Sequence, residues 1–493
     1  MLKKKHFHHL TITQFSQIPD SADIYDDVDI RITMDGDPFQ ADSKAYSAVM
    51  PFLETYKPEN HDGRRLVCKI LFRSMNTYSA LQTSNIQASI EDKVEVYPYT
   101  KEDMWAHSLF ATFRDKKYPP LDREQITYES DKTIHLVLIG FSSWTESLAR
   151  MAALVCHFPN YIRDHSLRTR ITLIDTDIRH KTAAFRNRIK NLLDNSYVRY
   201  VDTESCSSTF HAPMYSTSRE DFVDVEWEFV EGDETCKDVI SKLSYWSDDP
   251  GQILTVAICN DSEERNISTI SMLPPELEKK GIPVLVKIEN DFIFSLINKK
   301  TNVISFGKEQ EYAAIYKARR MGMAINYVYH RCYSMNCIEY TGSVLSPTEI
   351  DFAEAESLWN RLTPAKRFSN IYNALCLSSK MRSLGHKEED WGTYYSITSK
   401  EIELLSIVEH NRWSVDELIL GFRPTTDSEQ KKIESDINLK KEFRKNKVHY
   451  DLRAYDDLRQ DETGKDVAIY DICLTEAMPL IATACSTGEE GCL

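Results

Sequence analysis

The chain has 493 residues, a net charge of −16 and 42% hydrophobic side chains, which predicts two to four domains with ordinary cores. The excess of acids argues against broad binding of nucleic acid, whose phosphates attract Lys and Arg. No apolar run reaches about 18 residues, so we expect no membrane span. The start MLKKKHFHHL lacks the apolar core of a secretory signal, and the eleven cysteines form no CxxC pair. We therefore expect a cytoplasmic protein with reduced thiols and no metal site.

Residues 1–125 predict an incomplete Rossmann-like unit. The segments RRLVCKILF (64–72) and KVEVYPY (93–99) have the apolar patterns of strands, and FQADSKAYSAVMPFLETY (39–56) has the pattern of a helix. We find no opening strand followed by a Gly-rich turn ahead of them. An incomplete sheet leaves an unpaired edge, so we expect a homo-oligomer, either a dimer or a larger assembly.

Residues 131–325 predict a complete unit of the same class, because strand and helix patterns alternate throughout. This alternation is typical of a mostly parallel α/β sheet with helices on both faces, a Rossmann-like arrangement. The polar stretch 203–224 predicts a surface insertion. The predicted strands are 134–140, 170–177, 197–202, 225–233, 253–261, 282–291 and 303–307.

The rest of the chain predicts helices: a connector over 326–385 and a small all-helical domain over 386–493. The segment EIELLSIVEHNRWSVDELILG (401–421) has strong helical periodicity and ends on a glycine, which is a common helix stop. The basic run within 431–447 alternates with acids and predicts a solvated helix face rather than a nucleic-acid site.

The turn after the first central strand is a candidate for phosphate binding. A dinucleotide-binding turn has the form G-x-G-x-x-G, and here Gly140 keeps the first place while Ser142 and Thr145 hold the other two. The helix that follows offers free N–H groups to an anion. We therefore assign cofactor binding to Gly140, Phe141, Ser142 and Ser143. In the alternative interpretation, Ser142 or Ser143 is a plain helix N-cap.

Polar residues close two more of the predicted strands. Asp175, with Asp177 close behind it, ends the second strand, where an acid of this fold class holds ribose hydroxyls. Asn260 closes another strand at the same edge of the sheet. We predict that all three bind the cofactor, although Asp175 or Asp177 could equally cap the next helix.

The helix 401–421 carries a second candidate site. Glu409 lies in an apolar stripe with Leu405 and Trp413, and a carboxylate there is costly unless something satisfies it. Aromatic rings can stack a base, and Arg or His can meet a phosphate. The predicted ligand-binding residues are Glu409, His410, Trp413, Arg423 and Tyr455. Alternatively, Trp413 is a core residue and Glu409 is tied to Arg423 or to a backbone N–H.

Two resemblances extend these predictions. The motifs HLVLIGF, RTRITLIDTD, LTVAICND and IPVLVKIEND resemble the RCK-like, Trk-type NAD-binding domains, and the likeness covers roughly residues 20–325. It implies dimerisation and binding of NAD or another adenine nucleotide. The motifs LLSIVEHNRW, LGFRP, HYDLRAYDDL and ETGKDVA resemble the prokaryotic ryanodine-receptor (RyR) domain over about 355–475. That likeness implies a small helical module that binds ligands, including nucleotides, and is not catalytic.

Our main functional hypothesis is a ligand-sensing regulatory protein that binds a nucleotide or a nucleotide-derived signal in its Rossmann-like domain, its RyR-like domain or both. The two resemblances together imply a stress or defence signalling role. The alternatives are an enzyme that consumes an NAD-like nucleotide, and an assembly protein without a ligand. We assign no catalytic residue, because the chain has no G-x-S-x-G, H-E-x-x-H or Walker A motif.

Overall fold

The computed structural model of the chain divides into two compact units. One consists of Met1–Met104 with Asp351–Asn370, and the other of Trp105–Ile350 with Ile371–Leu493. The two units group the residues differently from the four predicted segments. The structure describes residues 9–12, 29–32, 36–49, 57, 66–82, 89–90, 94–110, 118–214, 221–290, 292, 294–295, 300–308, 313–334, 349–386, 397–461 and 465–486.

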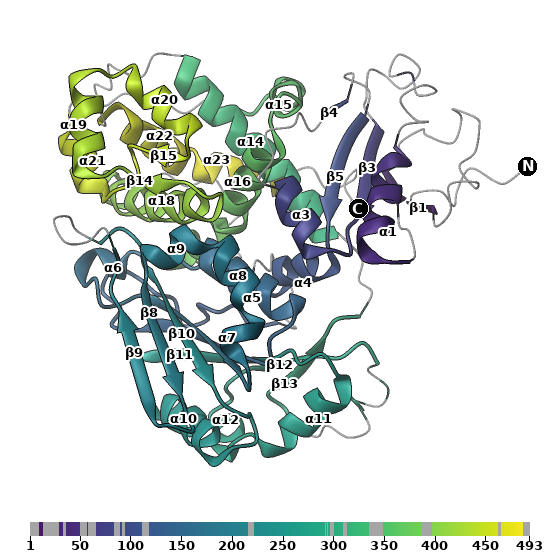
Figure 1. The fold of residues 1–493 in the computed structure, drawn as a ribbon. Helices are drawn as coiled ribbons and strands as arrows, with labels where there is room; N and C mark the ends of the chain where they lie inside the picture. Colours follow the sequence, from purple (N-terminus) through teal and green to yellow (C-terminus); the bar gives the residue numbers. More distant parts are fainter. Residues whose placement is uncertain are drawn as a thin grey trace, which may run out of the picture. The chain divides into compact units, whose positions relative to one another are not determined.

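The first unit is built on a five-stranded sheet in the order β1-β2-β3-β5-β4 (Figure 1). The first four of these strands run parallel, and β4 is antiparallel to β5. The bounds are β1 His9–Ile12, β2 Asp29–Ile32, β3 Leu66–Leu71, β4 Ser89–Ile90 and β5 Val94–Tyr99, with helices α1 Pro38–Ser47, α3 Met75–Gln82 and α15 Phe352–Trp359.

The prediction that this unit lacks an opening strand was wrong. The strand β2 lies ahead of α1 and pairs with β3, and Gly36 provides a left-handed turn between β2 and α1 with φ of 123°. The strand was missed because it has only four residues and alternates charged Asp29 and Arg31 with isoleucines. A short alternating segment lacks the continuous apolar run by which a buried parallel strand is identified.

The second unit contains an eight-stranded sheet in the order β13-β12-β11-β6-β7-β10-β8-β9. Every neighbouring pair is parallel except β8 and β9. The chain moves from β6 to β7 on one side and later places β11 on the other side, so the direction of winding reverses at β6. The bounds are β6 Thr133–Ile139, β7 Thr169–Asp175, β8 Tyr197–Asp202, β9 Ser207–His211, β10 Val225–Glu231, β11 Gln252–Ile258, β12 Val284–Lys287 and β13 Val303–Phe306.

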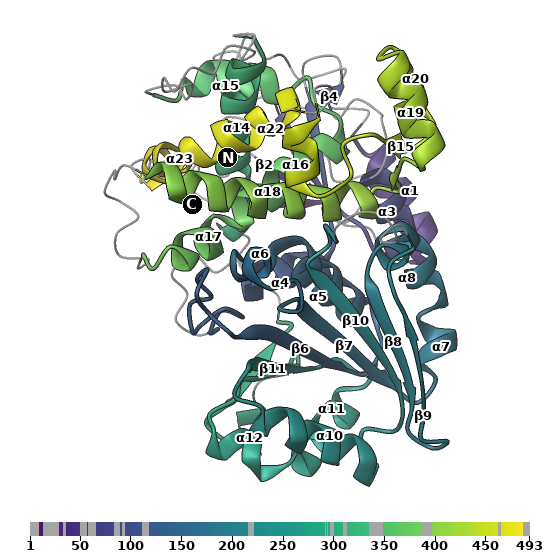
Figure 2. The same ribbon diagram turned by 90° about the vertical axis from the view of Figure 1, so that its left-hand side faces the viewer.

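Helices cover both faces of this sheet, as Figures 1 and 2 show, so the prediction of a mostly parallel α/β sheet is confirmed. A buried cluster joins Val137, Ile174 and Val230 of the strands to Leu243 and Trp246 of α10. The bounds are α4 Lys101–Phe110, which begins in the first unit, α5 Ser143–Val155, α6 Asn160–Arg163, α7 Ile178–Lys181, α8 Ala183–Arg188, α9 Lys190–Asp194, α10 Lys237–Asp248, α11 Glu263–Met272 and α12 Pro275–Lys279.

One detail of the sheet differs from the sequence prediction, and the strand order was not predicted. Part of the predicted insertion over 203–224 forms β9, the antiparallel edge strand, which pairs with β8. The strand β10 lies between β7 and β8, although it follows both of them along the chain. Strand order depends on where each crossover returns to the sheet, and local apolar patterns carry no information on that.

The C-terminal part of the second unit is helical, as predicted, with one small two-stranded pairing of β14 and β15. The long helix α18 begins with a capping box of Thr398 and Glu401 and stops before Gly421, which has φ of 87°. The bounds are α14 Ala313–Ser334, α16 Pro364–Leu375, which begins in the first unit, α17 Leu377–Ser383, α18 Ser399–Ile419, β14 Arg423–Pro424, α19 Asp427–Ser435, α20 Leu439–Lys445, β15 Val448–His449, α21 Tyr455–Gln460, α22 Lys465–Glu476 and α23 Met478–Ser486.

Among the residues that the structure describes, no single helix has the length and apolar composition needed to cross a membrane. One bent pair, Val467–Glu476 with Met478–Cys485, meets those two criteria when its halves are taken together, with a bend of 46°.

Candidate functional site

The turn after β6 lies where the winding of the sheet reverses. Gly140 takes a left-handed φ of 80°, and a Cβ atom there would lie 2.2 Å from Oδ1 and 2.8 Å from Cα of Asn260. No side chain fits in that space, so the glycine is required by both conformation and contact. The carboxyl edge of an open α/β sheet is the usual ligand position at such a reversal.

Hydrogen bonds within the chain hold the turn itself. The Ser142 hydroxyl donates to the Cys259 carbonyl at 2.7 Å, and the Thr145 hydroxyl donates to the Gly140 carbonyl. The amide of Ser142 donates to Thr145 Oγ1 at 3.3 Å. Ser142 occupies the N-cap position of α5 and Ser143 begins that helix. The two serines therefore lie at the start of the helix. Both predicted roles, a helix N-cap and an anion contact, require this position.

Asp175 ends β7 and reaches back to this turn. Its carboxylate accepts hydrogen bonds from the amides of Phe141 at 2.9 Å and Asp177 at 3.1 Å, and from Lys181 Nζ at 2.9 Å. Burial alone would raise the pKa of Asp175, but the bonds from Phe141 and Lys181 outweigh it and lower that pKa. Asp177, by contrast, is exposed and stands at the N-cap position of the short helix α7.

Asn260 follows β11 and packs on Gly140. Its side chain is 5% exposed, and its backbone N–H donates to Asn266 Oδ1 at 2.8 Å. Its Nδ2 donor has no hydrogen-bond partner among the described residues. A buried donor without an acceptor costs about 1–3 kcal/mol. The predicted residues Gly140, Phe141, Asp175 and Asn260 are thus brought together, and one polar group among them is left unsatisfied.

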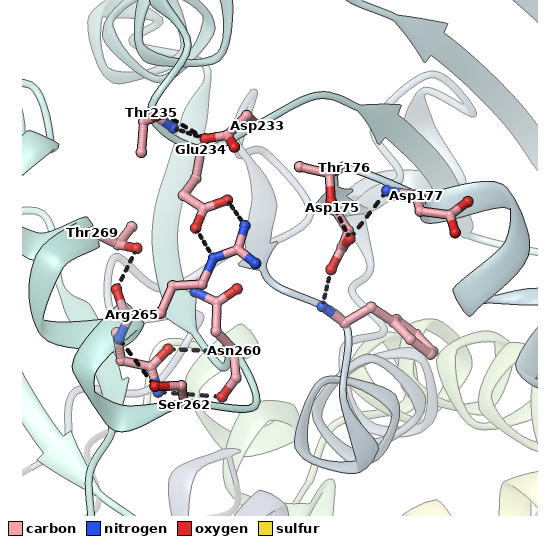
Figure 3. Close-up of polar contacts among 12 residues, drawn as sticks. Asp175, Thr176, Asp177, Asp233, Glu234, Thr235, Asn260, Ser262, Arg265 and Thr269 are labelled. Carbon is pink, nitrogen blue, oxygen red and sulfur yellow. Dashed lines mark hydrogen bonds and ion pairs between the residues drawn. The ribbon is translucent and has the colours of Figure 1, made fainter.

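An ion pair that the sequence analysis missed stands beside Asn260 (Figure 3). Arg265, in the first turn of α11, binds Glu234 through Nε at 2.5 Å and Nη2 at 2.7 Å. Glu234 is 3% exposed and follows β10, whereas the Arg265 side chain is 40% exposed. The pair places a half-exposed guanidinium at the same edge as Asp175. A signal was present in the sequence, since Arg265 lies five residues after Asn260, in the segment that follows the predicted strand 253–261.

The acid on α18 is hydrogen-bonded to three buried side chains. Glu409 is 2% exposed and accepts from Lys380 Nζ at 2.6 Å, Asn373 Nδ2 at 2.9 Å and Arg412 Nη2 at 2.8 Å. Burial would raise the pKa of Glu409, but the charges of Arg412 and Lys380 lower it to about 2. Glu409 is therefore tied as the alternative interpretation required, although its partners are neither Arg423 nor a backbone N–H.

The other predicted residues of this module fall into two groups. His410, Trp413 and Tyr455 lie together, with the His410 ring centroid 5.5 Å from each of the other two rings. Arg423 instead forms a bidentate ion pair with Glu429 at 2.8 and 2.9 Å. The structure gathers three of the five residues and gives Glu409 and Arg423 other partners.

No family model matches this chain, and no curated protein matches it by sequence. The likenesses to RCK-like and RyR domains therefore stay predictions. Within the part of the chain that the structure describes, no group of three or more His, Cys, Asp or Glu side chains is placed to hold a metal ion.

Proposed function

We propose that this protein is a nucleotide-binding regulatory protein, and that its ligand, NAD or another adenine nucleotide, binds at the carboxyl edge of the eight-stranded sheet. The observation that carries the proposal is the buried Asn260 amide, which has an unsatisfied donor at the reversal of winding. An oxygen of a bound ligand would accept from Nδ2 and remove the cost of leaving that donor unpaired.

The charged side chains near Asn260 match the phosphate and the ribose of a nucleotide. Arg265 keeps a half-exposed guanidinium at the edge, and such a group recognises phosphate oxygens through several N–H donors. Asp175 stands at the end of β7, the position from which an acid binds ribose hydroxyls in Rossmann-like domains. In the proposed complex, Arg265 meets phosphate and Asp175 meets ribose.

Ligand binding requires Asp175 to exchange partners. Its carboxylate already accepts from the Phe141 amide and from Lys181, so a ribose hydroxyl would replace or share one of these bonds. Release of the Phe141 amide would supply a donor to the phosphate at the start of α5. We propose that the bound and free states differ in these bonds of Asp175, which connect the turn after β6 with α7. A regulatory protein needs two such states, one of which the ligand favours.

The test is calorimetric titration of the full chain with NAD, ADP-ribose and ATP. Asn260→Asp has nearly the same shape but replaces the donor with an acceptor and adds a negative charge, so it should weaken binding by roughly tenfold or more. Asn290→Asp is the matched control, because Asn290 is exposed beyond β12 at the same edge and gains the same charge. Equal affinities of Asn260→Asp and wild type, or no binding of any of the three by wild type, would exclude this site.

A further inference from the structure

A cavity of about 480 Å³ lies on the sheet of the second unit, between α10 and the strands β7, β8 and β10. Ligand pockets usually have about 300–1,000 Å³. Arg170 and Gln252, which line it, lie at the start of β7 and β11, whereas Asp175 ends β7. Five residues of strand separate Arg170 from Asp175, or roughly 16 Å. The cavity is therefore separate from the carboxyl edge.

The sheet face under this cavity is apolar toward the carboxyl ends of the strands and polar toward their other ends. In the half nearer the carboxyl ends, Val137, Ile174 and Val230 pack against α10. In the other half, the inward positions are polar, and Arg199 of β8 lies directly opposite Glu228 of β10. A sheet face covered by helices is normally apolar, so a polar half-face needs partners for its charges or a ligand.

Two cations of the lining have no carboxylate partner among the described residues. Arg170 is paired with Glu226 at 2.5 Å. Arg199 instead lies 5.9 Å from the ring centroid of Phe210, and Lys242 of α10 lies 5.6 Å from that of Trp246. Two positive groups that face one cavity without a bound acid would attract an anion.

Acids also line the cavity, so the ligand must offer donors as well. Glu228 is 7% exposed and accepts from the Thr172 hydroxyl at 3.1 Å. The other two acids, Asp238 and Asp249, stand at the two ends of α10, and Asp249 accepts from Gln252 Nε2 at 2.7 Å. An anion alone would meet repulsion from these carboxylates, whereas a phosphorylated molecule with hydroxyl or amino groups could pair with both signs of charge.

Buried polar side chains lie next to Glu228 under the cavity. His135 is fully buried, and its ring nitrogens lie 2.6 Å from Gln252 Oε1 and 2.8 Å from Thr172 Oγ1. Burial, with the charge of Arg170, lowers the pKa of His135 to about 3, so the ring is neutral at pH 7. In the neutral ring Nδ1–H donates to Gln252 Oε1 and Nε2 can only accept, so the single hydroxyl proton of Thr172 goes either to His135 or to Glu228.

We propose that this cavity is a second binding site, for a small phosphorylated molecule with hydroxyl or amino donors, of which a nucleoside monophosphate is the representative. Arg199 and Lys242 bind the phosphate, and Glu228 accepts from a hydroxyl or amino group. Tyr245, which lines the cavity and is 72% exposed, offers a ring face to the base.

The experiment is calorimetric titration of the full chain with AMP, adenosine and inorganic phosphate, carried out in the Asn260→Asp background, which weakens binding at the carboxyl edge. We expect one AMP site per chain, with binding of adenosine and of phosphate at least tenfold weaker. Arg199→Gln and Lys242→Gln should each weaken AMP binding by roughly tenfold, since each removes one charge-assisted contact.

Lys237→Gln is the matched control, because Lys237 is exposed on the same helix but does not line the cavity. It should bind AMP like its parent. Both cavity variants change side chains at the surface, so their unfolding temperatures should equal that of the parent. The proposal is overturned if the parent does not bind AMP, if the doubly substituted Arg199→Gln, Lys242→Gln protein binds AMP as well as its parent, or if Lys237→Gln loses as much affinity as Lys242→Gln.

Discussion

Asn260 at the carboxyl edge of the sheet and Glu409 on α18 are both buried polar side chains, yet they differ in how completely each is hydrogen-bonded. Glu409 has bonds from Lys380, Asn373 and Arg412. Asn260 has a donor without a partner among the described residues. A satisfied network stabilises one arrangement, whereas an unsatisfied group leaves part of the stability to a ligand. Burial of a charge therefore does not by itself identify a binding site, and the alternative structural interpretation of Glu409 gains support.

The largest effect should follow from breaking the buried network of Glu409. Lys380→Met removes the cation 2.6 Å from Glu409, and loss of one partner of a buried ion pair costs about 3–5 kcal/mol. Urea unfolding followed by circular dichroism would measure it. The control is Lys190→Met, which removes an exposed i,i+4 pair with Asp194 and should cost less than about 0.5 kcal/mol. Similar losses in the two variants would mean that the network does not stabilise the fold.

The same network predicts a dependence of stability on pH. The pKa of Glu409 falls from 4.5 to about 2 on folding, so its contribution is fully present above pH 4.5 and is lost as the pH falls toward 2. The loss is about 3 kcal/mol. The difference in urea stability between wild type and Glu409→Gln should therefore shrink over that interval. A difference independent of pH would contradict the lowered pKa.

At the carboxyl edge, Gly140→Ala tests the fit between the turn and Asn260. The substitution combines a left-handed φ of 80° with a clash against backbone and side chain, and we expect a loss of about 2–3 kcal/mol. Gly281 also has a positive φ, of 63°, but a Cβ there would meet nothing within 4 Å. Gly281→Ala should therefore cost only about 1 kcal/mol, and equal losses would show that Asn260 does not crowd the turn.

The smallest effect is expected for Arg423, which was predicted to bind ligand in the RyR-like domain and not at the carboxyl edge of the sheet. Arg423 is one-third exposed and paired with Glu429, so Arg423→Ala should cost less than about 1 kcal/mol. It should change nucleotide affinity in calorimetry by less than about twofold, because the guanidinium is already occupied. A tenfold loss would instead restore Arg423 to the binding site predicted from the sequence.

Oligomerisation stays a prediction, and it now rests on the resemblance to RCK-like domains alone. The argument from a missing strand no longer holds, since β2 opens the first sheet. The likeness to RCK-like domains still implies a dimer, which light scattering of the full chain at micromolar concentration would detect. A monomer with and without NAD would contradict it.

Local sequence determined the strands that are continuous apolar runs and the helices that end on glycine. The strand β6 and the turn at Gly140 were predictable because a buried parallel strand needs such a run and the turn needs a residue without a side chain. For the same reason, the short alternating strand β2 was not identified.

Only the tertiary structure decided which side chains meet. Arg265 finds Glu234 across 31 residues, and Glu409 finds Lys380 across 29 and Asn373 across 36. Strand order, with β10 inserted between β7 and β8, brings the ends of β10 and β7 side by side. Such pairings depend on where each crossover returns the chain and on how helices pack, and the spacing of residue types along the sequence carries neither kind of information.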